Sequence, residues 1–219
     1  MKIKDLGLID FNEAYALQER VASGVAAGAE EETLLLLEHL PVYTIGSGGS
    51  ALNILDPSIG AVRINRGGDV TFHGPGQLVC YPIINLARRG RDLHRYLRFL
   101  EEFIIAIAAD FGVAGHRLSG KTGVWTGSLP ALSKLASIGV GVRRWVTMHG
   151  FSLNVTTDLS RFSLINPCGF IACPVTSLLI ESGKAVSVDQ IKERVAQCFE
   201  IFLDDLLPLD SGGIIKTWI

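Results

Sequence analysis

Cys168 lies in the stretch INPCGF (165–170), where a proline before it and a glycine after it are typical of a turn. A thiol on a turn could be a small packing residue, a metal ligand, half of a disulfide or a nucleophile. The other cysteines, Cys80, Cys173 and Cys198, form no CxxC pair and have no histidines at ligand spacing, which argues against a structural zinc site. A reducing cytoplasm would also disfavour a disulfide framework. A packing thiol and a nucleophile stay open, and a nucleophile would need a nearby cation to lower its pKa.

The stretch RGGDVTFHGPGQLVCY (66–81) is the densest polar feature of the chain. Two glycine-rich bends, at 67–68 and 74–76, frame the polar side chains of Asp69, Thr71 and His73. Backbone N–H groups of such bends can surround a ligand. The pattern is neither a Walker A motif nor a Rossmann fingerprint. A β-hairpin with polar turns is the other interpretation.

The stretch SKLASIGVGVRRWVTMHGFSLNV (133–155) begins with Lys134 and continues as an apolar, strand-like run. Ser137 and Gly139 would permit close backbone approach. His149 and Gly150 interrupt the second strand of the run. Taken alone, this pattern favours Lys134 as a solvated lysine at the end of a strand over a functional lysine.

Composition limits the classes of protein to which the chain can belong. The chain has 219 residues, 48% of them hydrophobic, and a formal net charge of −2, which argues against bulk nucleic-acid binding. No apolar run approaches the ~20 residues that span a bilayer. The N-terminus lacks the apolar core of a secretory signal, so we expect no membrane association and a cytoplasmic location.

Hydrophobic periodicity predicts helices over 10–28, 91–111 and 188–206. Asp92 is expected to cap the second helix, and Ser187 with Gln190 matches a capping box at the start of the third. Strands are expected at 32–40, 61–66, 77–86, 122–127, 134–142 and 145–155. Pro82 predicts an irregular or edge position for the strand that contains it. Helices at both ends and in the middle, with strands clustered between them, indicate one α+β domain over residues 1–219.

Three ordered blocks resemble the lipoyl(octanoyl) transferase family. RGGDVTFHGPGQ (66–77) is similar to the family signature, KLASIGVGVRRWVTMHGFSLNV (134–155) to a second block, and FSLINPCGF (162–170) to an INPCG block. LLLLEHLPVYTIG (34–46) resembles a further family stretch. The resemblance implies the fold of the biotin/lipoate protein ligase superfamily, a central mixed, largely antiparallel sheet flanked by helices.

The resemblance also implies roles for individual residues. Cys168 matches the cysteine that carries the acyl thioester, and Lys134 matches its partner lysine. Asp69 and Val70 occupy variable positions of the signature, so no individual role is assigned to them. The substrate-binding residues that the resemblance implies are Arg66, Gly67, Gly68, Asp69, Val70, Thr71, Phe72, His73, Ser137, Ile138, Gly139, Gly150, Phe151 and Ser152. No metal and no cofactor is implied.

The implied reaction moves an octanoyl or lipoyl group from acyl carrier protein to a lysine of a lipoyl domain, as the first step of endogenous protein lipoylation. Expected acceptors are the lipoyl domains of 2-oxoacid dehydrogenase complexes or the glycine cleavage H protein. Two alternatives are an ATP-dependent lipoate or biotin ligase, which needs no nucleophilic cysteine, and a lipoyl-domain binding module without chemistry. For the transferase, Cys168 and Lys134 should lie within a few ångströms of each other beside the 66–77 loop.

The stretch 88–98 is rich in arginine, and Arg91, Arg95 and Arg98 have the i, i+4, i+7 spacing of one helix face. Acyl carrier proteins and lipoyl domains are acidic, so this face is a candidate docking surface. A solvated helix face is the alternative. No unpaired amphipathic seam is evident, which favours a monomer.

Overall fold

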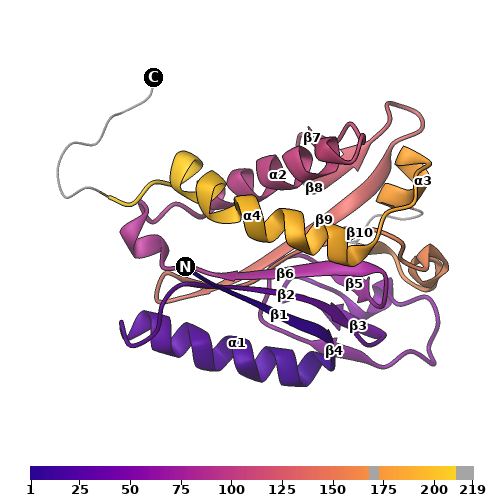
Figure 1. Ribbon diagram of the computed structural model, residues 1–219. Coiled ribbons are helices and arrows are strands. Elements are labelled where there is room, and N and C mark those ends of the chain that lie inside the picture. The colour runs from indigo at the N-terminus through magenta and orange to yellow at the C-terminus, as the bar shows by residue number, and fades with distance from the viewer. Residues whose placement is uncertain (168–172, 211–219) are drawn as a thin grey trace.

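The computed structural model describes residues 1–167 and 173–210. A seven-stranded sheet in the order β1-β2-β6-β10-β9-β8-β7 crosses the molecule (Figure 1). The strands of this sheet are β1 (Lys2–Ile9), β2 (Thr33–His39), β6 (Gln77–Ile83), β7 (His116–Leu118), β8 (Lys121–Thr126), β9 (Ser133–Arg143) and β10 (Val146–Asn154). β1 and β2 pair in parallel and the other neighbours are antiparallel, which confirms the predicted mixed, largely antiparallel sheet.

A second sheet of three short strands lies at one end of the molecule (Figure 1). It consists of β3 (Val42–Ile45), β4 (Ala61–Arg63) and β5 (Val70–His73), in the order β4-β3-β5. β5 pairs with β3, whereas β6 pairs with β2 and β10. The bend at 74–76 therefore carries the chain from one sheet to the other, and the β-hairpin interpretation of 66–81 is wrong.

Helices cover both faces of the large sheet. α1 (Phe11–Ala26) lies on one face, and α2 (Leu93–Asp110) and α4 (Val188–Leu206) lie side by side on the other (Figure 1). Shorter elements are α3 (Leu178–Ser182) and the 3-10 turns η1 (Ala51–Asn53), η2 (Leu86–Arg88) and η3 (Leu159–Leu164). In residues 1–167 and 173–210, no helix has both the length and the apolarity that crossing a bilayer requires.

The helix ends follow from local signals in the sequence. The Asp92 side chain accepts a hydrogen bond from the backbone N–H of Arg95, as its predicted N-cap role requires. Ser187 and Gln190 form the predicted capping box at the start of α4. The three predicted helices are thus confirmed, with ends that differ by one or two residues.

Each face of the large sheet has its own apolar core. Beneath α2 and α4, large side chains such as Leu100, Phe103 and Phe199 are fully buried. Cys80 and Cys198 pack into the same core, and burial raises the pKa of both thiols, as expected for packing cysteines. A separate cluster fills the space beneath α1, and a third lies beside the small sheet.

Pro82 does not lie on an edge strand, because β6 has β2 on one side and β10 on the other. Ladder pairing between β6 and β10 runs from Gln77 to Cys80 and stops before Pro82. Proline has no backbone N–H, and at this position β10 has no ladder partner that would need one. The prediction of an irregular position for Pro82 is therefore confirmed, and the alternative of an edge strand is wrong.

The prediction that Arg91, Arg95 and Arg98 share one helix face is wrong for Arg91. Arg91 precedes α2 and has a φ of 50°, so it does not continue the helical spacing. Arg95 donates to the carbonyl oxygen of Leu206 at 2.8 Å, and Arg98 pairs with Glu101 on its own helix. These guanidinium groups thus have partners within the chain, which favours a structural role for them over docking.

A pair of leucine substitutions tests the core beneath α2. Leu100 is fully buried, whereas Leu52 is 88% exposed. We expect Leu100→Ala to lower the free energy of unfolding by about 2–5 kcal/mol through lost burial and a residual cavity. The same substitution at Leu52 should change it by less than about 0.5 kcal/mol. Urea titration measures both values, and equal losses would contradict this packing.

Candidate active site

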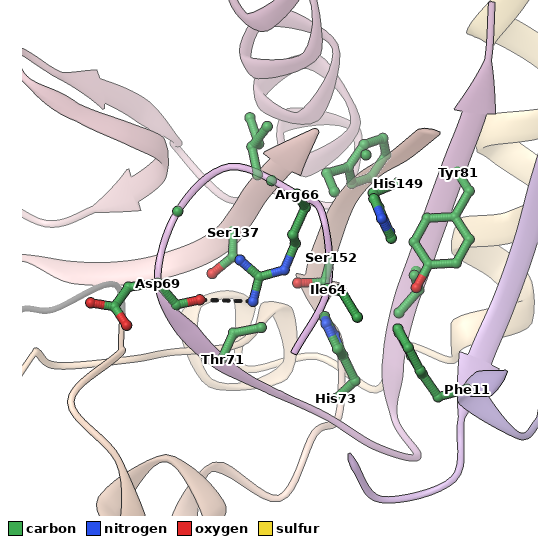
Figure 2. A pocket seen from close by; sticks show the side chains of 16 residues that line it. Phe11, Ile64, Arg66, Asp69, Thr71, His73, Tyr81, Ser137, His149 and Ser152 are labelled. Atoms are coloured by element: carbon green, nitrogen blue, oxygen red, sulfur yellow. Dashed lines mark hydrogen bonds between the residues drawn. The ribbon is translucent and has the colours of Figure 1, made fainter. Parts of the chain in front are cut away.

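A pocket lies between the two sheets, on the face of the large sheet that α1 covers. Its empty volume, including the part open to solvent, is about 470 Å³, within the range of small-molecule sites. It is lined by Phe11, Ile64, Arg66, Gly68, Asp69, Thr71, His73, Val79, Tyr81, Ser137, Ile138, Gly139, His149, Gly150, Phe151 and Ser152. The blocks at 66–77 and 134–155, far apart in the sequence, thus meet in one cavity (Figure 2).

The period-two alternation of β5 decides which residues of the 66–73 block face this pocket. Asp69, Thr71 and His73 line it. Val70 and Phe72 point the other way, into the cluster beside the small sheet. Three residues predicted to bind substrate, Gly67, Val70 and Phe72, are therefore not among those that line the pocket.

Arg66 lies at the pocket wall, between the small sheet and β9. The residue is only 7% exposed. Its Nη2 donates to the carbonyl and hydroxyl oxygens of Thr44 in β3 and to the carbonyl oxygen of Asp69. Figure 2 shows the side chain extended between Ser137 and Thr71. A Cβ on Gly139 of β9 would lie 2.9 Å from the Arg66 Cδ. Glycine at 139 thus lets the arginine lie against the large sheet.

A β-bulge in β9 places Lys134 on the pocket side of the sheet. Val124 pairs with Ala136, but Trp125 pairs with Lys134, so β9 has one extra residue, Leu135. Leu135 and Ala136 are consecutive, yet both belong to the core beneath α2 and α4. Because alternation is shifted by one at the bulge, Lys134 faces the same side as Ser137 and Gly139.

Lys134 is 3% exposed, so the interpretation of a solvated lysine at a strand end is wrong. Its Nζ lies 5.3 Å from the centre of the Trp125 ring. Its backbone N–H donates to the carbonyl oxygen of Pro174, and its carbonyl oxygen accepts from the N–H of Thr176. The chain just after the INPCG block is thus hydrogen-bonded directly to Lys134.

Cys168 lies outside the described residues, so its predicted contact with Lys134 stays a prediction. The residues on either side of the undescribed stretch are held in place. The N–H of Asn166 donates to the carbonyl oxygen of Asn53 at 2.7 Å, and Pro167 is buried. Cys173 is half-buried, one residue before the proline that bonds to Lys134.

Three histidines gather around the inner end of the pocket, and sequence reasoning assigned a role to only one of them. His73 and His149 line the pocket, and His39 lies behind His73 with ring centres 5.8 Å apart. Burial lowers the pKa of His39 to about 4 and the pKa values of His73 and His149 to about 3. All three are therefore uncharged near neutral pH, and the fixed charge beside them is the Arg66 guanidinium.

Hydrogen bonds hold these imidazoles in place. His39 Nε2 lies 2.7 Å from the hydroxyl of Tyr81, and His73 Nδ1 lies 2.7 Å from Gln77 Oε1. His149 has a φ of 58° and turns its ring toward Asn65, with Nε2 3.2 Å from Oδ1. The arrangement gives this end of the pocket neutral polar groups with fixed orientations. The described residues contain no cluster of three or more His, Cys, Asp or Glu side chains that could hold a metal.

The pocket residues that the sequence did not reveal are Phe11, Ile64, Val79, Tyr81 and His149. Two signals could have found some of them. Val79 and Tyr81 alternate along a strand that directly follows the GPGQ bend. His149 precedes Gly150 at an interruption of β10 that the sequence did indicate. Phe11 and Ile64 reach the pocket only through tertiary packing.

Comparison with known proteins agrees with this geometry. The family model described as the lipoyl protein ligase A/B catalytic domain matches residues 10–200. The chain belongs to this family. It is 66% identical to the octanoyltransferase of Geotalea uraniireducens, over 95% of this chain and 96% of the relative.

Solved structures of a lipoate protein ligase and a biotin protein ligase share the fold. A bipartite lipoate protein ligase of Thermoplasma acidophilum superposes with a TM-score of 0.67 at 15% identity, covering 95% of this chain and 84% of that one. A biotin protein ligase of Aquifex aeolicus gives 0.57 at 11% identity, over 94% and 72% of the two chains. The predicted biotin/lipoate protein ligase-like fold is confirmed.

The buried imidazoles predict how stability depends on pH. Each takes up a proton near pH 6.5 in the unfolded chain but only near pH 3 to 4 in the folded one. Their contribution to stability is therefore complete above about pH 6.5 and is lost as the pH falls toward about 4. In that window the free energy of unfolding should drop by about 1.4 kcal/mol per pH unit for each buried histidine.

Urea titrations at several pH values measure this slope. His149→Gln should reduce it by one histidine's share. His94→Gln, at an exposed position on α2, is the matched control variant. A slope that His149→Gln does not alter would show that folding leaves the pKa of this imidazole unchanged, and would contradict its burial as an uncharged group.

Proposed function

We propose that the chain is an acyltransferase that moves an octanoyl group from acyl carrier protein to a lysine of a lipoyl domain through a thioester on Cys168. A relative that is 66% identical over almost the whole chain is named octanoyltransferase. The observation that carries the proposal is the buried Lys134 on the pocket face, hydrogen-bonded through its backbone to the chain that follows Cys168. Residues 1–219 act as one catalytic domain in the cytoplasm.

The first half of the reaction forms the acyl-enzyme. The Cys168 thiolate attacks the carbonyl carbon of the donor thioester, and the carrier's sulfur leaves with a proton. The ammonium of Lys134 stabilises the thiolate by its charge and supplies that proton. Because one thioester replaces another, the energetic demand falls on activation of the thiol rather than on the overall equilibrium.

The second half transfers the acyl group to the acceptor. The amine nitrogen of the acceptor lysine bonds to the acyl carbon, and the Cys168 sulfur leaves as a thiolate. Lys134, neutral after the first half, takes the proton that the amine loses and returns to its starting state. One residue thus handles the proton in both halves.

The pocket supports this assignment by its chemistry. Phe11, Ile64 and Val79 offer apolar surface to an acyl chain, and each buried CH₂ contributes about 0.8 kcal/mol. The uncharged state of the histidines lowers the cost of placing alkyl groups beside them. Arg66 with the Ser137 and Ser152 hydroxyls forms the polar side, suited to the carbonyl end of the substrate.

Intact-mass analysis after incubation with octanoyl-acyl carrier protein tests the proposal. We expect one octanoyl group on the wild-type chain and none on Cys168→Ser. Cys173→Ser, which changes the neighbouring half-buried thiol, should keep the adduct. Lys134→Ala should form it about 10²–10⁴-fold more slowly, because the cation and the proton carrier are lost.

Two results would decide against the transferase. Octanoylation of a lipoyl domain that required ATP and survived Cys168→Ser would identify a ligase. Tight binding of a lipoyl domain with neither an adduct nor transfer would identify a binding module. The NPCG block favours the transferase over both, since neither alternative needs a nucleophilic cysteine.

A further inference from the structure

The ring of Trp125 lies directly beside the buried ammonium of Lys134. The distance from Nζ to the ring centre is 5.3 Å, and the tryptophan is 3% exposed. A cation within about 6 Å of an indole centre is attracted by the negative face of the ring, most strongly where water is excluded. We propose that Trp125 is a positioning residue whose ring holds the Lys134 ammonium on the pocket face of β9. The inference rests on the proposed function of Lys134.

The strand geometry explains why the indole lies on this side. Val124 points into the core beneath α2 and α4, so its neighbours Gly123 and Trp125 point to the opposite face. The bulge at Leu135 turns Lys134 to that same face. The indole is oriented by its own hydrogen bond, in which Nε1 donates to the carbonyl oxygen of Lys121 at 3.3 Å.

Gly123 lies against the Lys134 side chain, next to Trp125 on β8. Its φ is 120°, and a Cβ there would lie 2.9 Å from Cε of Lys134 and 2.6 Å from the carbonyl oxygen of Ala136. The lysine stem therefore occupies space that only glycine leaves open. The N–H of Gly123 donates to Oε1 of Glu101, a carboxylate 1% exposed that reaches it from α2. Residues of β8 thus surround the Lys134 side chain, and α2 fixes β8 through the hydrogen bond between Gly123 and Glu101.

A second lysine contacts the same ring and provides a natural control. Lys121 Nζ lies 5.6 Å from the Trp125 ring centre, but this lysine is exposed. Among the described residues, nearby charged groups include Glu101, which accepts from the Gly123 N–H and pairs with Arg98 and Arg117. They also include Glu181, which accepts from the hydroxyl of Thr176. Water screens the Lys121 contact, so the effect of the ring should fall mainly on Lys134.

The test lowers the electron density of the Trp125 ring with fluorine substituents and leaves the shape of the ring nearly unchanged. The chain has three tryptophans, so a Trp145→Phe, Trp218→Phe background leaves Trp125 alone to be replaced by tryptophans with one, two or three ring fluorines. Cys173→Ser in the same background limits alkylation by iodoacetamide to Cys168, since Cys80 and Cys198 are buried. The alkylation rate against pH reports the thiolate fraction of Cys168.

We expect the midpoint of this pH profile to rise with each fluorine, by about half a unit to one unit over the series, because a weaker ring holds the ammonium less well. Trp125→Phe should give a smaller rise than Trp125→Leu. Lys121→Met should leave the response to fluorination intact. In Lys134→Met, fluorination should no longer move the midpoint.

The outcomes separate the two claims. A midpoint that does not move with fluorination, in a chain where Lys134→Met abolishes octanoyl transfer, would overturn the role of Trp125 and leave the proposed function standing. A midpoint that moves equally in Lys134→Met would overturn it too, since the effect would not act through that lysine. Unchanged transfer and acyl-enzyme formation by Lys134→Met would instead contradict the proposed function.

Discussion

One extra residue in β9 determines on which face of the sheet Lys134 lies. Without the bulge at Leu135, strict alternation would send the lysine into the apolar core beneath α2 and α4, where a charged group is costly. With the bulge, two consecutive apolar residues fill that core and the lysine lies on the pocket face of the sheet. At Lys134, β9 no longer pairs with β10 and instead forms backbone hydrogen bonds with Pro174 and Thr176, in the segment after the INPCG block. The same irregularity thus orients the lysine and binds the chain that follows Cys168.

The pocket on this face of the sheet depends on how the two sheets meet. Arg66 is held to the small sheet by Thr44 and the carbonyl oxygen of Asp69, and Gly139 of β9 leaves room for it. Its fixed positive charge also lowers the pKa of His73 and His149 further, after the larger effect of burial. The result is a cavity with one cationic, hydroxyl-rich side and one neutral, largely apolar side. Such a cavity matches an acyl chain that ends in a polarisable carbonyl.

The sequence predicts well what short-range signals decide. The caps at Asp92 and Ser187 fixed the helix starts, and the family blocks identified most of the pocket wall. Long-range features were not predictable: the bend at 74–76 changes sheets, Pro82 lies in an interior strand, and Arg91 precedes its helix. Lys134 shows the limit most clearly. Its residue type and neighbours suggest a solvated strand end, and only the family resemblance indicated its importance, because a single-residue bulge leaves no periodic trace.

The proposed mechanism requires Cys168 and Lys134 to act as a pair at this pocket. A crystal structure of the chain after reaction with octanoyl-acyl carrier protein tests it most directly. We expect an octanoyl thioester on Cys168, its chain in the pocket between Arg66 and His149, and Nζ of Lys134 within about 3 Å of a thioester atom. An acyl chain bound outside the 66–77 pocket, or a Lys134 ammonium well separated from the thioester, would contradict the proposed mechanism.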